Sequence, residues 1–182
     1  MVEAEVKRIL LEEYDRFYRL AFSYVRNEAD ALDIVQESAY KAMKGAGSLR
    51  EAAFARTWIY RIVVNESLQT LRRKRQTLSL NAPVQAQSMT GGGAKSDSAA
   101  QQPLIDFLER EEQGREFVPE EQAARLDLQQ AIAALPEQEQ TLIRLRFFEE
   151  LKLEEIAAVL NENLSTIKSR LYRTLRQLRT VL

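Results

Sequence analysis

The sequence predicts an all-α protein made of two small helical domains joined by a flexible linker. Apolar residues recur at three- and four-residue steps along most of the chain, which is the spacing of one face of a helix. A polar stretch rich in Gly, Ser and Gln interrupts that pattern. The segment after residue 150 has the pattern of a helix-turn-helix. We therefore expect domains at 1–76 and 119–182, with the linker at 77–118.

The first domain is predicted to open with helices over residues 6–25 and 29–44, separated by a polar break at Asn27 and Glu28. The side chains expected to face its core are Ile9, Leu10, Tyr14, Phe17, Leu20, Ala21, Tyr24, Leu32, Val35, Ala39 and Met43. The outer face of the second helix carries Asp30, Asp33, Gln36 and Glu37. Clustered carboxylates can hold a metal ion or catalyse proton transfer, but no further ligand or nucleophile accompanies them. A solvated or protein-binding face is therefore favoured.

A third helix is predicted from about residue 57 to residue 75, after Gly45 and Gly47 release the chain from the second. Its apolar side carries Trp58, Ile59, Ile62, Val63 and Leu68. Its polar and cationic positions are Arg56, Tyr60, Arg61, Asn65, Gln69, Arg72 and Arg73. Cations at a helix C-terminus commonly complement the helix dipole, so the basic run 72–75 is not diagnostic alone. Combined with aromatic and amide side chains, it is typical of a surface that stacks bases and holds phosphates.

The second domain is predicted to begin with two helices, 120–135 and 137–148, which start after Pro119 and Pro136. Their core side chains are expected to be Leu128, Ile132, Leu135, Leu142, Ile143, Leu145 and Phe147. Two shorter helices follow, joined by the polar turn 161–163. Their apolar faces are expected to be Ile156, Ala157, Leu160, Ile167, Leu171, Leu175 and Leu178.

The last helix carries the DNA-binding prediction. From Asn163 to the C-terminus there are five basic residues and no acidic ones. Its first turns hold Ser165, Thr166, Lys168, Ser169 and Arg170, where a recognition helix meets base edges, while Arg173 and Arg176 could reach phosphates. An ordinary solvated basic helix is the alternative. The absence of acids and the preceding helix and turn favour DNA.

Composition excludes several classes of function. The chain has no cysteine and no histidine, which removes disulfides, thiolate and imidazole metal sites and histidine-based catalysis. We expect no cofactor, no metal, no small-molecule substrate and no enzymatic activity. No apolar run is long enough to cross a bilayer, and acids stand near the start where a signal peptide needs cations. A cytoplasmic protein is therefore expected.

Charge is distributed unevenly although the net charge is only −1. Residues 77–120 carry 3 basic and 7 acidic side chains, whereas residues 1–76 carry 14 and 11. An acidic connector between two locally basic halves predicts modest intrinsic affinity for DNA, because few phosphates are neutralised overall. A partner that supplies further affinity is expected.

Four stretches together resemble the extracytoplasmic-function (ECF) group of bacterial RNA polymerase sigma factors, of the sigma-70 family. They are YDRFYRLAFSYV, ADALDIVQESAYKA, TWIYRIVVNESLQTLRRKR and ALPEQEQTLIRLRFFEELKLEEIAAVLNENLSTIKSRLYR, in the family's order. The resemblance implies sigma2-like and sigma4-like domains that bind core polymerase and promoter DNA. It also suggests an anti-sigma factor, which in this family is commonly membrane-anchored.

The resemblance implies roles for individual positions. Binding to the clamp helices of the polymerase beta-prime subunit would fall to Asp33, Gln36 and Glu37. The −10 element would be held by Arg56, Trp58, Arg61, Asn65, Gln69, Arg72 and Arg73, with the loop 49–55 capturing an unstacked base. The −35 element would be read by Ser165, Thr166, Lys168, Ser169, Arg170 and Arg173, and a nearby apolar surface would hold the beta flap.

The sequence departs from the family pattern at three positions. Gln69 stands where an Asp is frequent, which leaves base preference there open. Lys152 replaces a capping Ser, at a cost of about 1 kcal/mol. Asn161 replaces the turn Gly but tolerates the same left-handed conformation. A helix-turn-helix regulator that is not a polymerase subunit remains the alternative, although it would leave the helix 57–75 and the DIVQE face without a role.

Overall fold

The computed structural model describes residues 2–80, 127–128 and 130–181, and these are helical with short turns and no strand. The elements are α1 Val2–Glu12, α2 Tyr14–Val25, α3 Glu28–Gly45, the 3-10 turns Ala46–Ser48 and Ala52–Phe54, α4 Ala55–Leu80, α7 Glu137–Ile143, the π-helical turn Arg144–Phe148, α8 Leu153–Leu160 and α9 Leu164–Val181. Most of the predicted linker and the expected helix start at Glu120 lie outside the described residues. The all-α prediction is confirmed for the part that is described.

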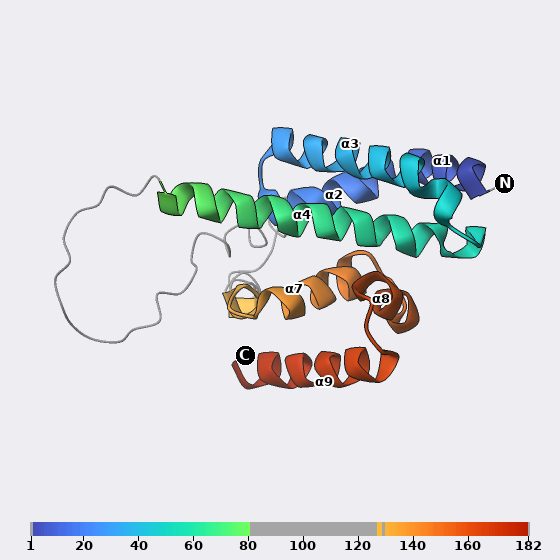
Figure 1. The fold of residues 1–182 in the computed structure, drawn as a ribbon. Coiled ribbons are helices and arrows are strands. Elements are labelled where there is room, and N and C mark those ends of the chain that lie inside the picture. Colours follow the sequence, from blue (N-terminus) through green and yellow to red (C-terminus); the bar gives the residue numbers. More distant parts are fainter. Residues whose placement is uncertain (1, 81–126, 129, 182) are drawn as a thin grey trace, which may run out of the picture.

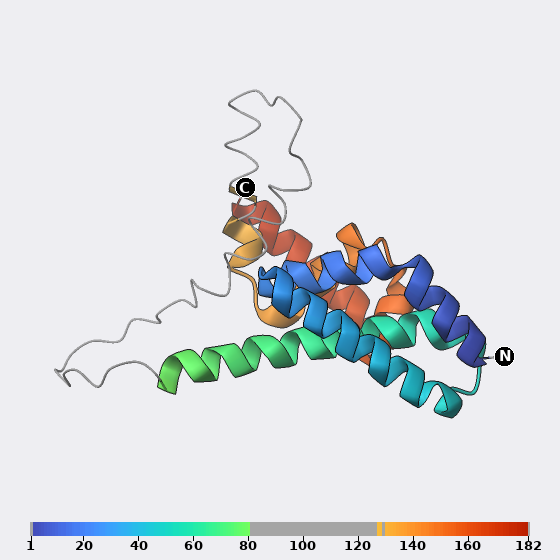
Figure 2. The ribbon, with the colours of Figure 1, turned by 90° about the horizontal axis from the view of Figure 1, so that it is seen from above.

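The long helix α4 forms the middle layer of the molecule (Figure 1). Helices α1, α2 and α3 pack on one side of it, and α7, α8 and α9 lie on the other. Seen from above, the C-terminal end of α4 extends beyond the body of the molecule (Figure 2). The helix continues to Leu80, past the predicted domain boundary at residue 76.

Helix boundaries follow local side-chain chemistry. The side chain of Asn27 accepts a hydrogen bond from the backbone N–H of Asp30 at 3.0 Å and so caps the start of α3, at the polar break predicted there. Asn161 ends α8 in the left-handed conformation with φ 55°, as predicted. The single helix predicted over 6–25 is wrong, because the backbone leaves helical geometry at Glu13 and divides it into α1 and α2.

Gly45 ends α3 for a different reason from the one expected. Its φ is −89°, which any residue can adopt, so no left-handed conformation is involved. A Cβ at this position would instead lie 3.1 Å from the ring of Trp58. Gly45 therefore leaves room for the indole ring. Trp58 is half-buried and lies in the first turn of α4, next to the C-terminal end of α3.

Burial confirms most of the predicted core. Phe17, Leu20, Ile59, Leu142 and Ile167 are at most 1% exposed. Six side chains expected to be internal are exposed instead: Tyr14, Leu32, Met43, Leu128, Phe147 and Leu175. These residues lie at the margins of the predicted apolar faces, where helical spacing alone cannot decide which residue the neighbouring helix covers.

The helices of both predicted domains share one buried core. The Tyr24 hydroxyl lies 3.1 Å from the Thr141 hydroxyl, which joins α2 to α7. The guanidinium of Arg144 lies 4.2 Å from the centre of the Tyr24 ring and is itself buried. Burial lowers the pKa of Arg144. The packing of the C-terminal helices against the N-terminal ones was not predicted from the sequence.

Substitutions can distinguish the buried face of α9 from its exposed face. Ile167→Ala should lower the free energy of unfolding by about 2–4 kcal/mol, because the side chain is fully buried and its removal leaves a cavity. Leu175→Ala, on the same helix but 37% exposed, should cost less than about half as much. Urea denaturation followed by circular dichroism measures both, and equal losses would contradict the assigned face of α9.

Candidate nucleic-acid interface

Helix α4 presents a row of polar and cationic side chains along one face. Arg61, Asn65 and Arg72 follow one another at helical spacing, and the latter two are exposed. Gln69 and Arg73 are exposed beside them. Cations and amides at this spacing can hold several successive phosphates and bases of one strand.

An open groove of about 750 Å³ lies between α3 and α4. It brings together two sets of residues that the sequence assigned to different partners. Asp33, Gln36 and Glu37 line it from α3, and Gln69 and Arg73 line it from α4. The predicted polymerase face and part of the predicted −10 face are therefore adjacent surfaces.

Two residues that line the groove form a salt bridge that was not predicted from the sequence. Lys41 Nζ lies 2.6 Å from Glu66 Oε1, and the Glu66 side chain is 12% exposed. This pair joins α3 to α4 across the lining of the groove.

The helix-turn-helix is formed by α8, the turn at 161–163 and α9. Five of its predicted −35 residues line one shallow hollow of about 330 Å³: Ser165, Thr166, Ser169, Arg170 and Arg173. Lys168 is exposed on the same helix. Hydroxyls and guanidinium groups gathered on one helical face are suited to contacts with base edges and phosphates.

Two arginines of α9 are paired with carboxylates. Arg170 forms a fork with Glu162, with nitrogen–oxygen distances of 2.8 and 2.9 Å. Arg173 Nη2 lies 2.9 Å from Glu139, which is buried on α7. Both guanidinium groups are therefore already hydrogen-bonded within the chain.

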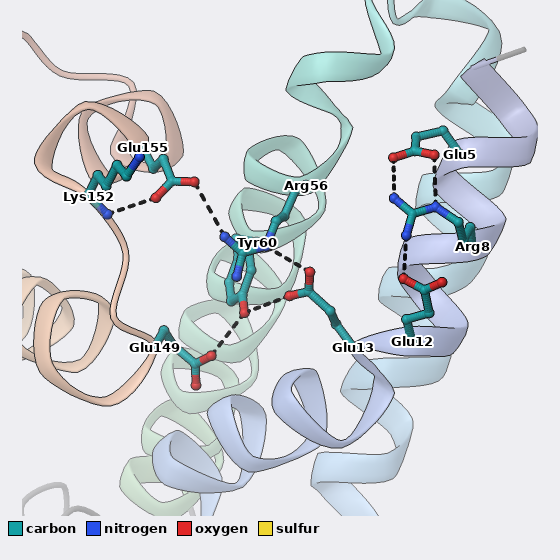
Figure 3. A network of polar contacts seen from close by, with 9 residues as sticks. All are labelled: Glu5, Arg8, Glu12, Glu13, Arg56, Tyr60, Glu149, Lys152 and Glu155. Atoms are coloured by element: carbon teal, nitrogen blue, oxygen red, sulfur yellow. Dashed lines mark hydrogen bonds and ion pairs between the residues drawn. The ribbon is translucent and has the colours of Figure 1, made fainter.

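The first two turns of α4 carry a polar network that reaches the C-terminal helices (Figure 3). Arg56 Nε donates to Glu13 at 2.7 Å, and Arg56 Nη1 lies 3.3 Å from Glu155 on α8. Glu155 also accepts from the backbone N–H of Lys152 at 2.7 Å, which caps α8. The Lys152 side chain has no acceptor, so only the half of the capping box that Glu155 provides can form, and the hydrogen bond that a Ser side chain would accept is missing.

A buried hydroxyl lies between two carboxylates in the same network. The Tyr60 hydroxyl is 2.9 Å from Glu149 and 3.1 Å from Glu13 (Figure 3). A single phenolic proton can be donated to one of them at a time. Burial, and the neighbouring carboxylates Glu149 and Glu13, raise the pKa of Tyr60 above its ordinary value. Burial also raises the pKa of Glu149, against the opposing effects of the Tyr60 hydrogen bond and of Arg16 and Arg19.

Two further arginines of α4 contact the C-terminal helices. Arg61 donates from Nε to the carbonyl of Ala158 at 3.1 Å, and its Nη2 contacts the same oxygen. Arg72 Nη2 lies 3.2 Å from Glu137 at the start of α7. The predicted −10 residues are thus divided: Arg56, Arg61 and Arg72 contact the C-terminal helices, whereas Trp58 packs on Gly45.

The arrangement is suited to binding a polyanion. The described residues hold no group of three or more acidic side chains that could bind a metal ion. Within the same residues, no helix is long and apolar enough to span a membrane. The two faces carry guanidinium, ammonium, amide and hydroxyl groups, which can donate hydrogen bonds to phosphates and base edges.

Comparison with known proteins agrees with this chemistry. Residues 10–77 match the family model of sigma-70 region 2, and residues 125–178 match that of sigma-70 region 4. The RNA polymerase sigma factor SigV of Bacillus subtilis is 38% identical over 90% of this chain and 82% of its own. The ECF RNA polymerase sigma factor SigW of the same organism is 30% identical over 91% of this chain and 82% of its own.

A solved structure shares the fold. The sigma factor RpoE from Bartonella quintana, in complex with the anti-sigma factor NepR, superposes with a TM-score of 0.62. The match covers 96% of this chain and 94% of that chain at 20% sequence identity.

The buried carboxyl of Glu149 should make stability depend on pH. Its pKa is raised in the folded protein, so the folded state binds the proton more tightly than the unfolded chain. This contribution is complete below the ordinary carboxyl pKa of about 4.3 and is lost as pH rises through the raised value. Glu149→Gln should therefore flatten the fall in unfolding free energy above about pH 4.

Urea titrations at a series of pH values measure this slope. Glu154→Gln, which removes a charge from an exposed position on α8, serves as the control and should keep the wild-type slope. An unchanged slope in Glu149→Gln would show that Glu149 does not take up a proton on folding.

Proposed function

This chain belongs to the ECF group of the sigma-70 family of RNA polymerase sigma factors, and from that premise we propose which of its surfaces meet which partners. Its function is to bind core RNA polymerase and to direct promoter-specific transcription initiation. We propose that residues 1–76 form the −10 module, residues 119–182 the −35 module, and residues 77–118 the linker. One observation supports this assignment. Each of the two regions that match a sigma-70 family model carries one helix face of basic and polar side chains suited to DNA.

The −10 element is assigned to α4 and the loop before it. Asn65, Gln69 and Arg73 are exposed on α4 and can contact bases and phosphates directly. Arg56, Arg61 and Arg72 would join them after leaving the C-terminal helices. In the loop, Phe54 is 55% exposed and offers a ring on which a displaced base can stack. Trp58, which packs against Gly45, would stabilise the position of this face of α4.

The −35 element is assigned to the hollow on α9. Its hydroxyl and arginine side chains lie on the first turns of a recognition helix, and Lys168 stands exposed beside them. A helix with this composition can enter the major groove of a duplex. Unlike the −10 module, this one needs no melted strand, because it reads paired DNA.

The outer face of α3 is assigned to the polymerase. Asp33, Gln36 and Glu37 are all exposed there, and Glu37 is held only by Lys41 at 3.3 Å. We propose that this face binds the clamp helices of the beta-prime subunit and that apolar surface near α9 binds the beta flap. Once polymerase fixes both modules, the second DNA contact becomes effectively intramolecular.

Other parts of the assignment follow from the family. Sigma factors are non-catalytic initiation subunits, and we propose that this chain acts likewise, without a cofactor or a small-molecule substrate, in the cytoplasm with the polymerase. The fold neighbour is bound to an anti-sigma factor. We propose a membrane-anchored anti-sigma partner here also.

A helix-turn-helix regulator that acts without joining the polymerase is the disfavoured alternative. It would account for α8 and α9 but not for the match of residues 10–77 to sigma-70 region 2. Run-off transcription with purified core polymerase separates the two. A sigma factor confers start sites, whereas a free-standing regulator binds promoters without polymerase and initiates nothing.

The polymerase face can be tested by measuring affinity for core polymerase. Gln36→Ala combined with Glu37→Ala should weaken association with core polymerase while the fold stays intact, because both side chains are exposed. Affinity is measured with labelled core enzyme, and circular dichroism checks the fold. Asp15→Asn, an exposed position on α2, is the control. Wild-type affinity in the double variant would remove the assignment.

Base reading by α9 predicts a sequence-selective loss. Arg170→Ala should weaken binding of polymerase holoenzyme to promoters mainly through the −35 element, by about 1–3 kcal/mol. Arg179→Ala, near the exposed end of the same helix, should change affinity less and similarly for every sequence. Equal losses on promoter and scrambled −35 sequences in Arg170→Ala would contradict base reading.

A further inference from the structure

Helix α4 carries an acidic residue within the face that the proposed function gives to the −10 element. Glu66 follows Asn65 directly and precedes Gln69 by three positions. Arg73 lies two helical turns beyond Glu66, at nearly the same angle around the helix axis. A carboxylate here repels the phosphates that Gln69 and Arg73 are expected to contact. Its charge would therefore weaken DNA binding unless a cation compensates it.

Lys41 of α3 supplies that cation. Its Nζ lies 2.6 Å from Glu66 Oε1, within the lining of the groove between the two helices. The Glu66 side chain is only 12% exposed, so water screens its charge less than it would on an open surface. Removing the lysine alone would leave the carboxylate without its paired ammonium group.

The same ammonium group also reaches the face of α3 that is assigned to the polymerase. It lies 3.3 Å from Glu37 Oε1, one turn away on the same helix. Glu37 is exposed, whereas Glu66 is both the nearer and the more buried acceptor. We therefore expect the pairing with Glu66 to be the one that matters for DNA.

The packing of α3 on α4 has sources other than this pair. Buried apolar side chains of both helices belong to one core. Lys74 forms a second ion pair between the two helices, with Asp30. Helix α3 should therefore stay in place without the contact between Lys41 and Glu66. The contribution particular to that contact is a positive charge beside Glu66.

We propose that Lys41 is a positioning residue for the −10 face, which it serves by neutralising Glu66 and not by contacting DNA itself. The inference rests on the proposed function and adds to it a residue of α3 that the −10 assignment does not contain. With Lys41 in place, Gln69 and Arg73 can meet a phosphate beside a compensated carboxylate. Without it, the charge of Glu66 opposes the same contact.

Four variants separate this role from its alternatives. Lys41→Met removes the charge and keeps an apolar stem. Glu66→Gln removes the opposing charge, and the double variant removes both. Lys44→Met, at an exposed position three residues further along α3, is the control for net charge. Circular dichroism and urea denaturation check that each variant is folded.

Binding is measured by fluorescence anisotropy with holoenzyme formed at saturating core polymerase. The probe is a single-stranded oligonucleotide with the −10 element of a promoter on which the wild type initiates. Lys41→Met should weaken binding about fivefold at low salt, and the loss should shrink as salt rises, because ions screen the repulsion. Glu66→Gln and the double variant should bind at least as tightly as the wild type. Lys44→Met should match the wild type.

Other patterns overturn the proposal. A loss in Lys41→Met that persists in the double variant would show that the lysine itself contacts DNA. Equal losses in both single variants and in the double variant would show that the pair only braces α3 against α4. An equal loss in Lys44→Met would assign the effect to net charge, and wild-type affinity in Lys41→Met would remove the role altogether.

Arg73→Ala on the same probe tests the proposed function separately. If Arg73→Ala loses affinity and Lys41→Met does not, the role of Lys41 is rejected and the −10 face stands. If Arg73→Ala binds like the wild type, the assignment of the −10 element to this face of α4 is itself rejected.

Discussion

The packing of α4 on two sides is the constraint on which the rest of the structure depends. Its apolar residues complete the core formed with α1, α2 and α3, and its arginines lie on another side of the helix. When α8 lies on that side, Arg56 and Arg61 obtain acceptors from within the chain. The same helix therefore completes the N-terminal bundle and holds the C-terminal helices through its arginines.

Much of the fold could be predicted because it is encoded locally. Helical spacing identified α3, α4 and the helix-turn-helix, and the left-handed turn at Asn161 followed from the properties of that residue. The division at Glu13 could not be predicted, because the contacts of its side chain are with Arg56 and Tyr60, more than 40 positions away. The role of Gly45 was equally hidden, since it depends on where the Trp58 ring lies.

The contacts of the candidate site were harder to predict from the sequence than the helices were. Helical spacing predicted that the residues expected to contact DNA share common helix faces. Five of the six residues predicted on α9 line the same hollow. No pattern indicated that Glu155 would meet Arg56, because 99 positions separate them. Pairing between distant carboxylates and arginines also explains how a chain of net charge −1 can carry two cationic faces. Arg56, Arg170 and Arg173 are each paired with a carboxylate from another part of the chain.

The wide turn at Arg144–Phe148 has a consequence for how the C-terminal helices are phased. The N–H of Glu149 bonds to the carbonyl of Arg144, five residues earlier, so this turn holds one residue more than an α-helical turn. Each residue advances a helix by about 100°. After this turn Glu149 contacts the Tyr60 hydroxyl, and Glu150 leaves in the left-handed conformation with φ 54°. With one residue fewer in the turn, the residues that follow would be rotated by about 100° and a different side chain would face the tyrosine.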